Sequence, residues 1–214
     1  MEEKQAAHPG DESQQPLPAV PLGKAFFLLF TAGILSAVGG FMFVLIRSLS
    51  MNAMGFDALE ISSPAVVGGI ISLPLPVLLG WLSDRVDRKW VLILGYLQVV
   101  IGLIMLAVPQ QLWQFWLGSA LAGITVGANN SAGNALVTDL VPSISLGKAL
   151  SLFSATAWIG GIIGFALAGL LLNTFGVALS CYIGAILVLA GVGLLLLIKR
   201  KYGMVRRPLG KSAP

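Results

Sequence analysis

Uncharged polar side chains stand inside long apolar stretches of this sequence, and they are the residues best suited to hold a small solute. Asn129, Asn130 and Asn134 lie close together, with Thr125 one helical turn before Asn129. Asn130 and Asn134 share one helix face, and Thr125 and Asn129 share another. Bare amides that face lipid are costly, so we expect this side to face protein or water. The pattern favours solute recognition by hydrogen bonds, with bonding between helices as the equal alternative.

Gln98 and Trp158 are weaker candidates for the same substrate-binding role. The single histidine, His8, precedes the apolar part of the chain, and the single cysteine, Cys181, lies inside an apolar run. These two residues offer neither an intrachain disulfide nor a metal-binding cluster. No Gly-rich phosphate loop with Lys is present. We therefore predict no enzyme, no cofactor and no metal site.

A compact charged segment separates two of the apolar stretches. Its sequence is Gly80-Trp81-Leu82-Ser83-Asp84-Arg85-Val86-Asp87-Arg88-Lys89. Gly80, Asp84 and Arg88 are spaced by four and share a face if the helix continues that far. Glycine on that face permits close approach of another helix, and Asp84 can accept bonds from a helix N-terminus or pair with Arg88. Contacts of this kind hold a bundle closed on one side and break when it opens.

The elements that position these residues are predicted to be membrane-spanning helices. Of the 214 residues, 57% are hydrophobic and 10% are charged, against roughly a quarter charged in a soluble domain. Charges are absent from four runs, residues 25–46, 61–83, 90–138 and 149–198. Because a spanning helix needs about 20 mostly apolar residues, these runs predict a polytopic membrane protein.

Each of the two longer runs fits a helical hairpin. Turn residues break the first at Pro109-Gln110-Gln111 and the second at Asn173-Thr174-Phe175-Gly176. The six predicted spans are residues 25–47, 63–83, 90–109, 112–137, 149–172 and 177–198. Ser62-Ser63-Pro64 is interpreted as the cap and first turn of the second span. Pro74 and Pro76 predict a hinge or a static kink within it.

The basic residues predict an orientation. Six spans place both termini on one side, and if that side is cytoplasmic it holds all but one of the 13 Lys and Arg. The predicted domains are a disordered cytoplasmic tail at 1–23, a six-helix transmembrane domain at 24–198 and a basic cytoplasmic tail at 199–214. The basic tail is interpreted as an anchor near anionic lipid, so nucleic acid is not an expected partner.

Arg47 is the exception on the outer side. Counting from Ala25 along a helix puts it about 33 Å away, at the membrane interface. We expect its side chain to snorkel towards water, and capture of an anionic substrate is the minority alternative.

The segment 80–89 resembles the signature loop of the major facilitator superfamily, whose pattern is roughly G-x-L-a-D-R-x-G-R-[RK]. The matching residues are Gly80, Leu82, Asp84, Arg85, Arg88 and Lys89. Asp87 replaces the usual glycine. The resemblance implies that Asp139, at the end of the fourth span, is the partner of Arg88. The plainer interpretation is an inner loop whose basic residues only set topology.

That family has two six-span halves, and the chain is similar to one of them. Its polar, Pro-rich leader resembles the family's central loop entering the seventh span, which favours a C-terminal-half-like unit. The resemblance implies an all-α fold of six transmembrane helices and solute transport by alternating access, with a cavity lined by spans 1 and 4 of each half. The expected partners are membrane lipid, a small-molecule solute, and a second copy or a second six-span chain, in the plasma membrane. The alternative is a non-transporting, truncated or scaffolding membrane subunit.

The fifth predicted span contains a ladder of small residues, Gly160, Gly164 and Ala168. Small residues at this spacing let helix backbones approach closely, so the ladder predicts a packing seam. The alternative is an interface with a partner chain.

Overall fold

The computed structural model describes residues 22–108 and 111–198, which form helices and short connections without any strand. The elements in chain order are α1 (Lys24–Ala53), α2 (Ala58–Ser72), α3 (Leu75–Arg85), α4 (Arg88–Ala107), α5 (Leu112–Ala128), the π-helical η1 (Asn129–Gly133), α6 (Asn134–Leu140), the 3-10 turn η2 (Ser143–Ser145) and α7 (Leu146–Leu197). The all-α prediction is confirmed for these residues. Helices satisfy their own backbone groups, as an apolar surrounding requires.

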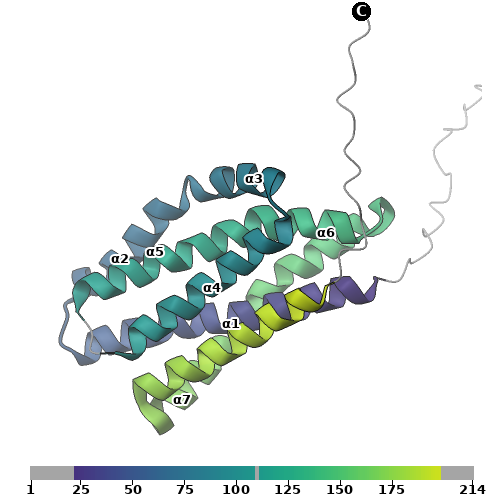
Figure 1. Cartoon of the computed structure of the whole chain (residues 1–214). Coiled ribbons are helices and arrows are strands. Elements are labelled where there is room, and N and C mark those ends of the chain that lie inside the picture. The colour runs from purple at the N-terminus through teal and green to yellow at the C-terminus, as the bar shows by residue number, and fades with distance from the viewer. Residues whose placement is uncertain (1–21, 109–110, 199–214) are drawn as a thin grey trace, which may run out of the picture.

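The helices pack side by side in one bundle (Figure 1). α2 and α3 form one edge, α5 lies between α2 and α4, and α1 packs against α4 and α7. The largest fully buried side chains include Phe26, Leu29, Met42, Ile46, Tyr96, Leu103, Phe115, Val188 and Leu195. They come from α1, α4, α5 and α7, so the core lies among those four elements.

α7 is a helical hairpin. Its 52 residues would extend about 78 Å as one straight helix, far more than a membrane core of about 30 Å. Gly176 interrupts it with φ 75 and ψ −177, a backbone conformation that glycine adopts without strain. The chain folds back there, between green and yellow in Figure 1. The predicted break at residues 173–176 is confirmed.

The first predicted hairpin break is also present. α4 ends at Ala107 and α5 begins at Leu112. The side chain of Gln114 accepts from the backbone N of Gln111 at 2.7 Å, which closes the start of α5 with a capping box. Residues 109 and 110 lie outside the described part of the chain.

The predicted start of the second span is wrong. α2 begins at Ala58, one turn before Ser62, and Pro64 lies inside the helix. Asp57 caps it, because its Oδ1 accepts from the backbone N of Glu60 at 2.7 Å and Glu60 Oε2 accepts from the backbone N of Asp57 at 3.0 Å. This reciprocal pair outcompetes a serine cap because it satisfies two backbone donors at once.

The kink predicted at Pro74 and Pro76 is present. α2 ends at Ser72, α3 begins at Leu75, and their axes differ by 45°. Pro74 has no N–H to donate to the carbonyl of Ile70, and its ring clashes with a continuing helix. The second span is therefore two helices joined at a bend.

The small-residue ladder of α7 packs against α1 within the same chain. A Cβ added to Gly164 would lie 2.6 Å from the carbonyl oxygen of Val38, and one added to Gly160 would lie 2.9 Å from that of Ile34. Ala168 is fully buried. The prediction of a packing seam is confirmed, since the two backbones approach as closely as glycine allows.

Among the described residues, three helical regions are long and apolar enough to cross a membrane: α1, α4 and the α7 hairpin region. The bent pair of α2 and α3 is a fourth if the two helices form one span. The count of six spans stays a prediction. It takes α5, η1 and α6 as one span and the two arms of α7 as two. The tails predicted at 1–23 and 199–214 lie outside the described residues, except for Leu22 and Gly23.

Candidate functional site

The charged segment joins α3 to α4 by a turn. α3 ends at Arg85, Val86 is extended with φ −110 and ψ 157, and α4 begins at Arg88. Asp87 is the N-cap, and its side chain accepts from the backbone N of Lys89 at 3.2 Å. An aspartate at the position where the family pattern has glycine therefore starts the next helix.

The condition for a common face of Gly80, Asp84 and Arg88 is not met, because the helix ends at Arg85, before Arg88. Arg88 turns towards the neighbouring helix α6 instead. Its Nη1 lies 2.8 Å from Asp139 Oδ1 and donates to the carbonyl oxygen of Ala135 at 3.0 Å. The partner that the resemblance implied for Arg88 is in place, and the pair ties the start of α4 to the end of α6.

The two other cations of the segment also have defined partners. Lys89 Nζ donates to the carbonyl oxygens of Leu196 and Ile198 at 3.0 and 2.9 Å, so it caps the end of α7. The guanidinium carbon of Arg85 lies 4.0 Å from the ring centroid of Trp81, a stacked cation–π contact. The segment therefore fixes three helix ends at one end of the bundle.

Gly80 and Asp84 contact little of this chain. A Cβ added to Gly80 would meet no atom within 4 Å, and Asp84 is exposed. Both lie on α3, four residues apart and on one face. This face is open in the described chain, whereas the glycine had been expected to lie against another helix.

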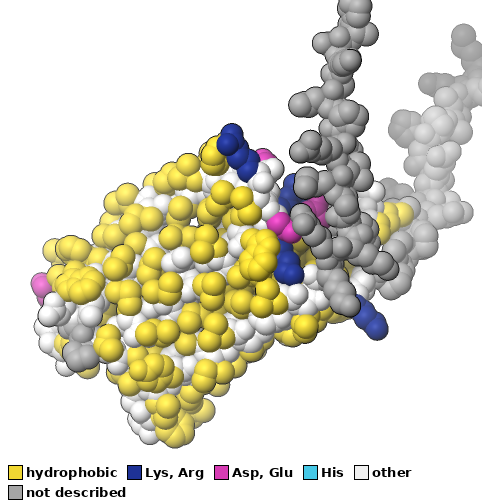
Figure 2. Space-filling model, viewed as in Figure 1, with side chains coloured by type: hydrophobic (Ala, Val, Ile, Leu, Met, Phe, Trp, Pro, Cys, Tyr) yellow, Lys and Arg dark blue, Asp and Glu magenta, His cyan; other side chains and the backbone are white. Residues whose placement is uncertain are grey.

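Charge is distributed along the bundle in a way that fits a membrane. In Figure 2 the Lys, Arg, Asp and Glu side chains gather near the end where α3, α4 and α6 meet, with an acidic side chain at the opposite end. Between them lies a broad surface of hydrophobic side chains without charges. Such a band matches the hydrocarbon layer of a bilayer.

Two of the polar candidates make contacts between helices. The Thr125 hydroxyl donates to the carbonyl oxygen of Gly95 at 2.6 Å, and the buried Tyr96 hydroxyl lies 3.2 Å from Asn129 Oδ1. Both contacts join α4 to the helical run of α5 and η1. For Thr125 and Asn129 the geometry corresponds to the alternative stated above, polar bonding that packs helices.

Asn130 and Asn134 lie differently. Asn130 is exposed, and Asn134 Nδ2 donates to the backbone oxygen of Asn130 at 3.0 Å. The five residues Asn129–Gly133 form a π-helical segment. Such insertions are frequent at functional sites, because they leave backbone groups and side chains in irregular positions. Asn130 is the candidate whose amide is open to a solute.

The weaker candidates are Gln98 and Trp158. No hydrogen bond among the described residues joins either of them to the polar side chains of α5 and η1. Gln98 is half-buried on α4, and Trp158 is 78% exposed on α7. Trp158 therefore projects from the bundle and requires another chain, lipid or solute to cover it.

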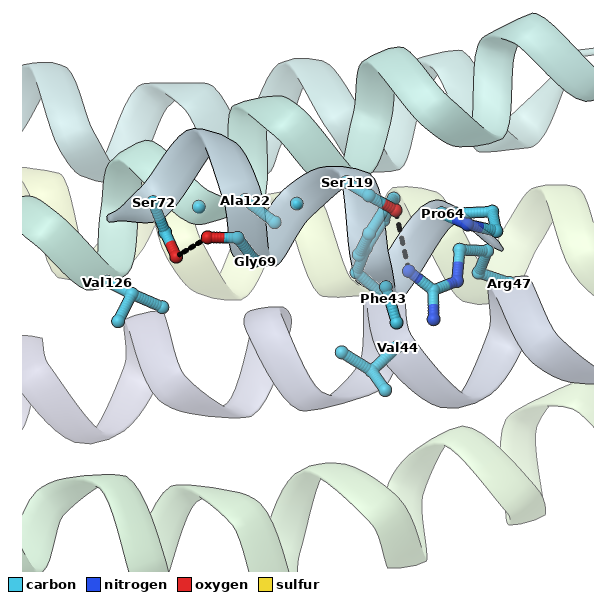
Figure 3. A pocket seen from close by; sticks show the side chains of 12 residues that line it. Phe43, Val44, Arg47, Pro64, Gly69, Ser72, Ser119, Ala122 and Val126 are labelled. Carbon is cyan, nitrogen blue, oxygen red and sulfur yellow. Dashed lines mark hydrogen bonds between the residues drawn. The ribbon is translucent and has the colours of Figure 1, made fainter. Parts of the chain in front are cut away.

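A pocket of about 260 Å³ lies between α1, α2 and α5 (Figure 3). α5 contributes Ser119, Ala122, Gly123 and Val126 to its wall. Asn130, four residues after Val126 and within the π-helical segment, does not line this pocket.

The expectation that Arg47 snorkels to water is wrong. Its side chain turns into the pocket, is 6% exposed, and donates from Nη1 to Ser119 Oγ at 2.6 Å. Arg47, Ser119 and Tyr96 are polar residues that sequence reasoning did not include in the site. Linear position along the helix suggested a membrane edge, but the rotation of the residue towards α5 decides its environment.

No group of three or more His, Cys, Asp and Glu among the described residues is placed to hold a metal ion. A helical bundle with a charge-free band and charged residues at its ends is typical of a helical membrane protein. The comparisons with known proteins make this class specific.

The model of the Major Facilitator Superfamily matches residues 29–213, and the chain belongs to that family. A multidrug resistance protein MdtH of Cronobacter sakazakii is 29% identical over 191 residues, covering 88% of this chain and 47% of the relative. A multidrug resistance protein MdtG of Dickeya zeae is 31% identical, over 73% of this chain and 38% of the relative. The chain thus spans about half the length, or less, of these curated relatives.

The fold has a counterpart among solved structures. The crystal structure of a peptide transporter POT in complex with sulfate superposes with a TM-score of 0.68 at 19% identity, over 86% of this chain and 39% of that one. At this identity the likeness concerns the fold alone. The chain is therefore an integral membrane protein with the fold of a partial-length major facilitator, from a family of transporters.

Proposed function

We propose that the chain is one half of a secondary transporter that moves a small solute by alternating access. The observation that carries the proposal is the contrast within the signature loop. Arg88 is paired with Asp139 inside the chain, whereas Gly80 and Asp84 present an open face on α3. A glycine without a neighbour and an exposed carboxylate four residues on form a ready contact for a helix N-terminus of a second half.

The second half is a second copy of this chain or another six-span chain. The matched region is 47% of the MdtH relative and 38% of the MdtG relative, and transporters of this architecture hold solute between two halves near the midplane. The open face of α3, the exposed Trp158 and the exposed Asn130 are then covered in the assembly. Neither enzymatic chemistry nor a resident cofactor forms part of the proposal.

Asn130 and Asn134 are proposed to contact the solute, with Gln98 and Trp158 as supporting candidates. Thr125 and Asn129 position η1 through their bonds to Gly95 and Tyr96. We propose that the signature loop gates the cytoplasmic side together with Asp139, the partner of Arg88. The loop residues concerned are Gly80, Asp84, Arg85, Arg88 and Lys89. In this proposal both termini lie in the cytoplasm and the protein lies in the plasma membrane. The distribution of Lys and Arg supports this orientation.

The test is solute flux in proteoliposomes that contain the purified chain, alone and with any second six-span chain encoded beside it. Uptake is measured with a panel of lipophilic cationic and anionic fluorescent dyes. We expect Asp84→Asn and Arg88→Ala each to lower the initial rate about tenfold, the scale of a 1–3 kcal/mol coupling between two states. The control is Lys148→Gln, which removes an exposed positive charge outside the signature loop. This variant should keep the initial rate of uptake.

A non-transporting scaffold or a truncated subunit is the second candidate. The observation that favours it is the length, since the chain covers 47% of the MdtH relative. A well-folded monomer without flux for any dye of the panel, alone and with a neighbouring chain, would support this candidate and contradict the first.

A further inference from the structure

The pocket between α1, α2 and α5 holds a cation that no acidic group of the described residues neutralises. Arg47 is 6% exposed, and its only recorded hydrogen bond goes to the neutral hydroxyl of Ser119. The Nε atom of Arg47 is buried without a partner in the described chain. No carboxylate in that part of the chain lies within 4.0 Å of the guanidinium. A buried charge in this state is costly unless a further group binds it.

The guanidinium is held in a fixed place. Its carbon lies 5.9 Å from the ring centroid of Phe43, one turn earlier on α1. That ring packs where Gly118 leaves space, since a Cβ there would lie 3.0 Å from the ring. Ser119 fixes the other side (Figure 3). The arginine is therefore preorganised by α1 and α5, which lowers the entropic cost of binding a ligand.

Arg47 also lies below the outer end of the bundle. Its partner Ser119 is seven residues into α5, which begins at Leu112, or about 10 Å along the helix axis. Snorkelling to the headgroups does not account for this position, because the side chain points across to α5 and not along α1 towards its end. The contact orients the charge into the pocket.

The pocket has room for an organic group beside the guanidinium. Its volume is about 260 Å³, against roughly 150 Å³ for an enclosed cavity that takes benzene, and it is open on one side, where Val44 and Val126 are exposed. Small residues make that space along α2 and α5, namely Ala65, Gly68, Gly69, Ser72, Ala122 and Gly123. The remaining wall is apolar, with Val44 and Val126 among its residues.

We infer that Arg47 and Ser119 bind the acidic group of an amphipathic organic anion, whose apolar body occupies the rest of the pocket. The inference rests on the proposed function, because it names the substrate class of that transporter. Guanidinium donors match the two oxygens of a carboxylate or sulfonate in one plane, and Nη1 is the only one of the nitrogens with a hydrogen bond in the described chain, to Ser119. The anion neutralises the buried charge, and Phe43 and the valines contact its body.

The test compares aromatic acids with their uncharged amides of the same shape. Benzoate with benzamide, and 2-naphthoate with 2-naphthamide, are titrated into the purified full chain in detergent at pH 7.5, where the acids are ionised. Binding is measured as the rise in apparent unfolding temperature. We expect each acid to bind at least about tenfold more tightly than its amide, the scale of one charge-assisted hydrogen bond.

Three variants assign the preference to the pocket. Arg47→Gln keeps a donor for Ser119 and should abolish the preference for acid over amide. Gly69→Leu retains the charge but fills the space, since a Cβ at Gly69 meets no atom within 4 Å; it should weaken both ligands of a pair. Lys148→Gln removes an exposed positive charge elsewhere and should change neither. If Arg47→Gln fails to fold, Gly69→Leu alone still decides whether binding takes place in this pocket.

Equal binding of acid and amide, no binding of any acid at millimolar concentration, or a preference that survives Arg47→Gln would each overturn the inference. A loss of dimer in Arg47→Gln together with no acid preference in the wild type would also overturn it, since Arg47 would then pair with a carboxylate of another chain. Equilibrium binding requires no flux. A chain that binds acids selectively but transports nothing would refute the proposed transport and leave the pocket assignment standing.

Discussion

Two helix contacts in this molecule, α1 against α7 and α2 against α5, both depend on glycine yet leave very different amounts of helix surface uncovered. Along α1 and α7, glycines at positions 160, 164 and 191 bring backbones within contact, and side chains on either side are buried. In α2 only Pro64 and Gly68 are buried; Leu73, at the bend, and Val77, beyond it, are 78% and 76% exposed. Both contacts run along the helices, but α2 and α3 meet α5 through small residues and leave most of their own side chains uncovered.

The difference indicates which part of the bundle can move. A close-packed seam has few alternative arrangements, because any shift separates many atoms at once. α2 and α3 bury only two residues each and are joined at a proline bend, so a shift of this arm, residues 58–85, separates fewer side chains. Asp84 lies near the end of α3, so part of the proposed gate belongs to this movable arm of α2 and α3.

The largest expected effect is at the α1–α7 seam. Gly164→Leu places a Cβ at 2.6 Å from the carbonyl oxygen of Val38, and we expect it to lower the free energy of unfolding by about 3 kcal/mol. Gly169→Leu, in the same arm of α7, meets no atom within 4 Å of its Cβ and should stay within about 0.5 kcal/mol of wild type. Denaturant unfolding in detergent, followed by tryptophan fluorescence, measures both.

If Gly164→Leu were as stable as Gly169→Leu, the seam would not be the rigid part of the bundle. The contrast between the two contacts would then have no energetic basis.

A smaller effect is expected at the α2–α5 contact, where neighbouring glycines provide a matched pair. A Cβ on Gly68 would lie 2.9 Å from the backbone oxygen of Ser119, whereas Gly69 has open space. We expect Gly68→Ala to destabilise the chain by about 1 kcal/mol. Gly69→Ala should be neutral or slightly stabilising, since alanine favours helix.

The same unfolding experiment applies to this pair. A loss for Gly68→Ala as large as that of Gly164→Leu would show that α2 is held as firmly as α7, and a movable arm at α2 would be excluded.

Much of the fold was predictable because membrane helices follow local rules. Charge-free runs placed α1 and α4, and turn residues placed the breaks at Ala107 and Gly176. The seam at Gly160 and Gly164 followed from spacing by four, which needs only one helix to be considered. The family membership followed from a contiguous motif. Each of these inferences uses information within about one helical turn or one span.

The site was less predictable, since it depends on which residues of distant helices meet. Arg47 and Ser119 are 72 positions apart, and no count along α1 shows that the arginine faces α5. The spacing divided the polar residues from Thr125 to Asn134 between two faces, but it did not show which face meets another helix. Tyr96 bonds Asn129, while Asn130 stays exposed. The cap at Asp57 differs from these cases. Asp-x-x-Glu at residues 57–60 is a local capping pattern, so this cap could have been predicted from the sequence.

The smallest expected effect concerns a tether between the movable arm and α5. Trp116 Nε1 donates to Ser63 Oγ at 2.8 Å, while the hydroxyl of Ser62 bonds only the carbonyl oxygen of Leu59 in its own helix. Ser63→Ala should cost about 0.6 kcal/mol, the average for a bond between membrane helices. Ser62→Ala removes the same kind of local bond without a tether and is the matched control. Hydrogen exchange should rise in α2 for Ser63→Ala and stay unchanged in α1 and α7, because only the α2 contact is weakened. Faster exchange throughout the bundle would mean that α2 and the seam open together, so that the two contacts form one cooperative unit.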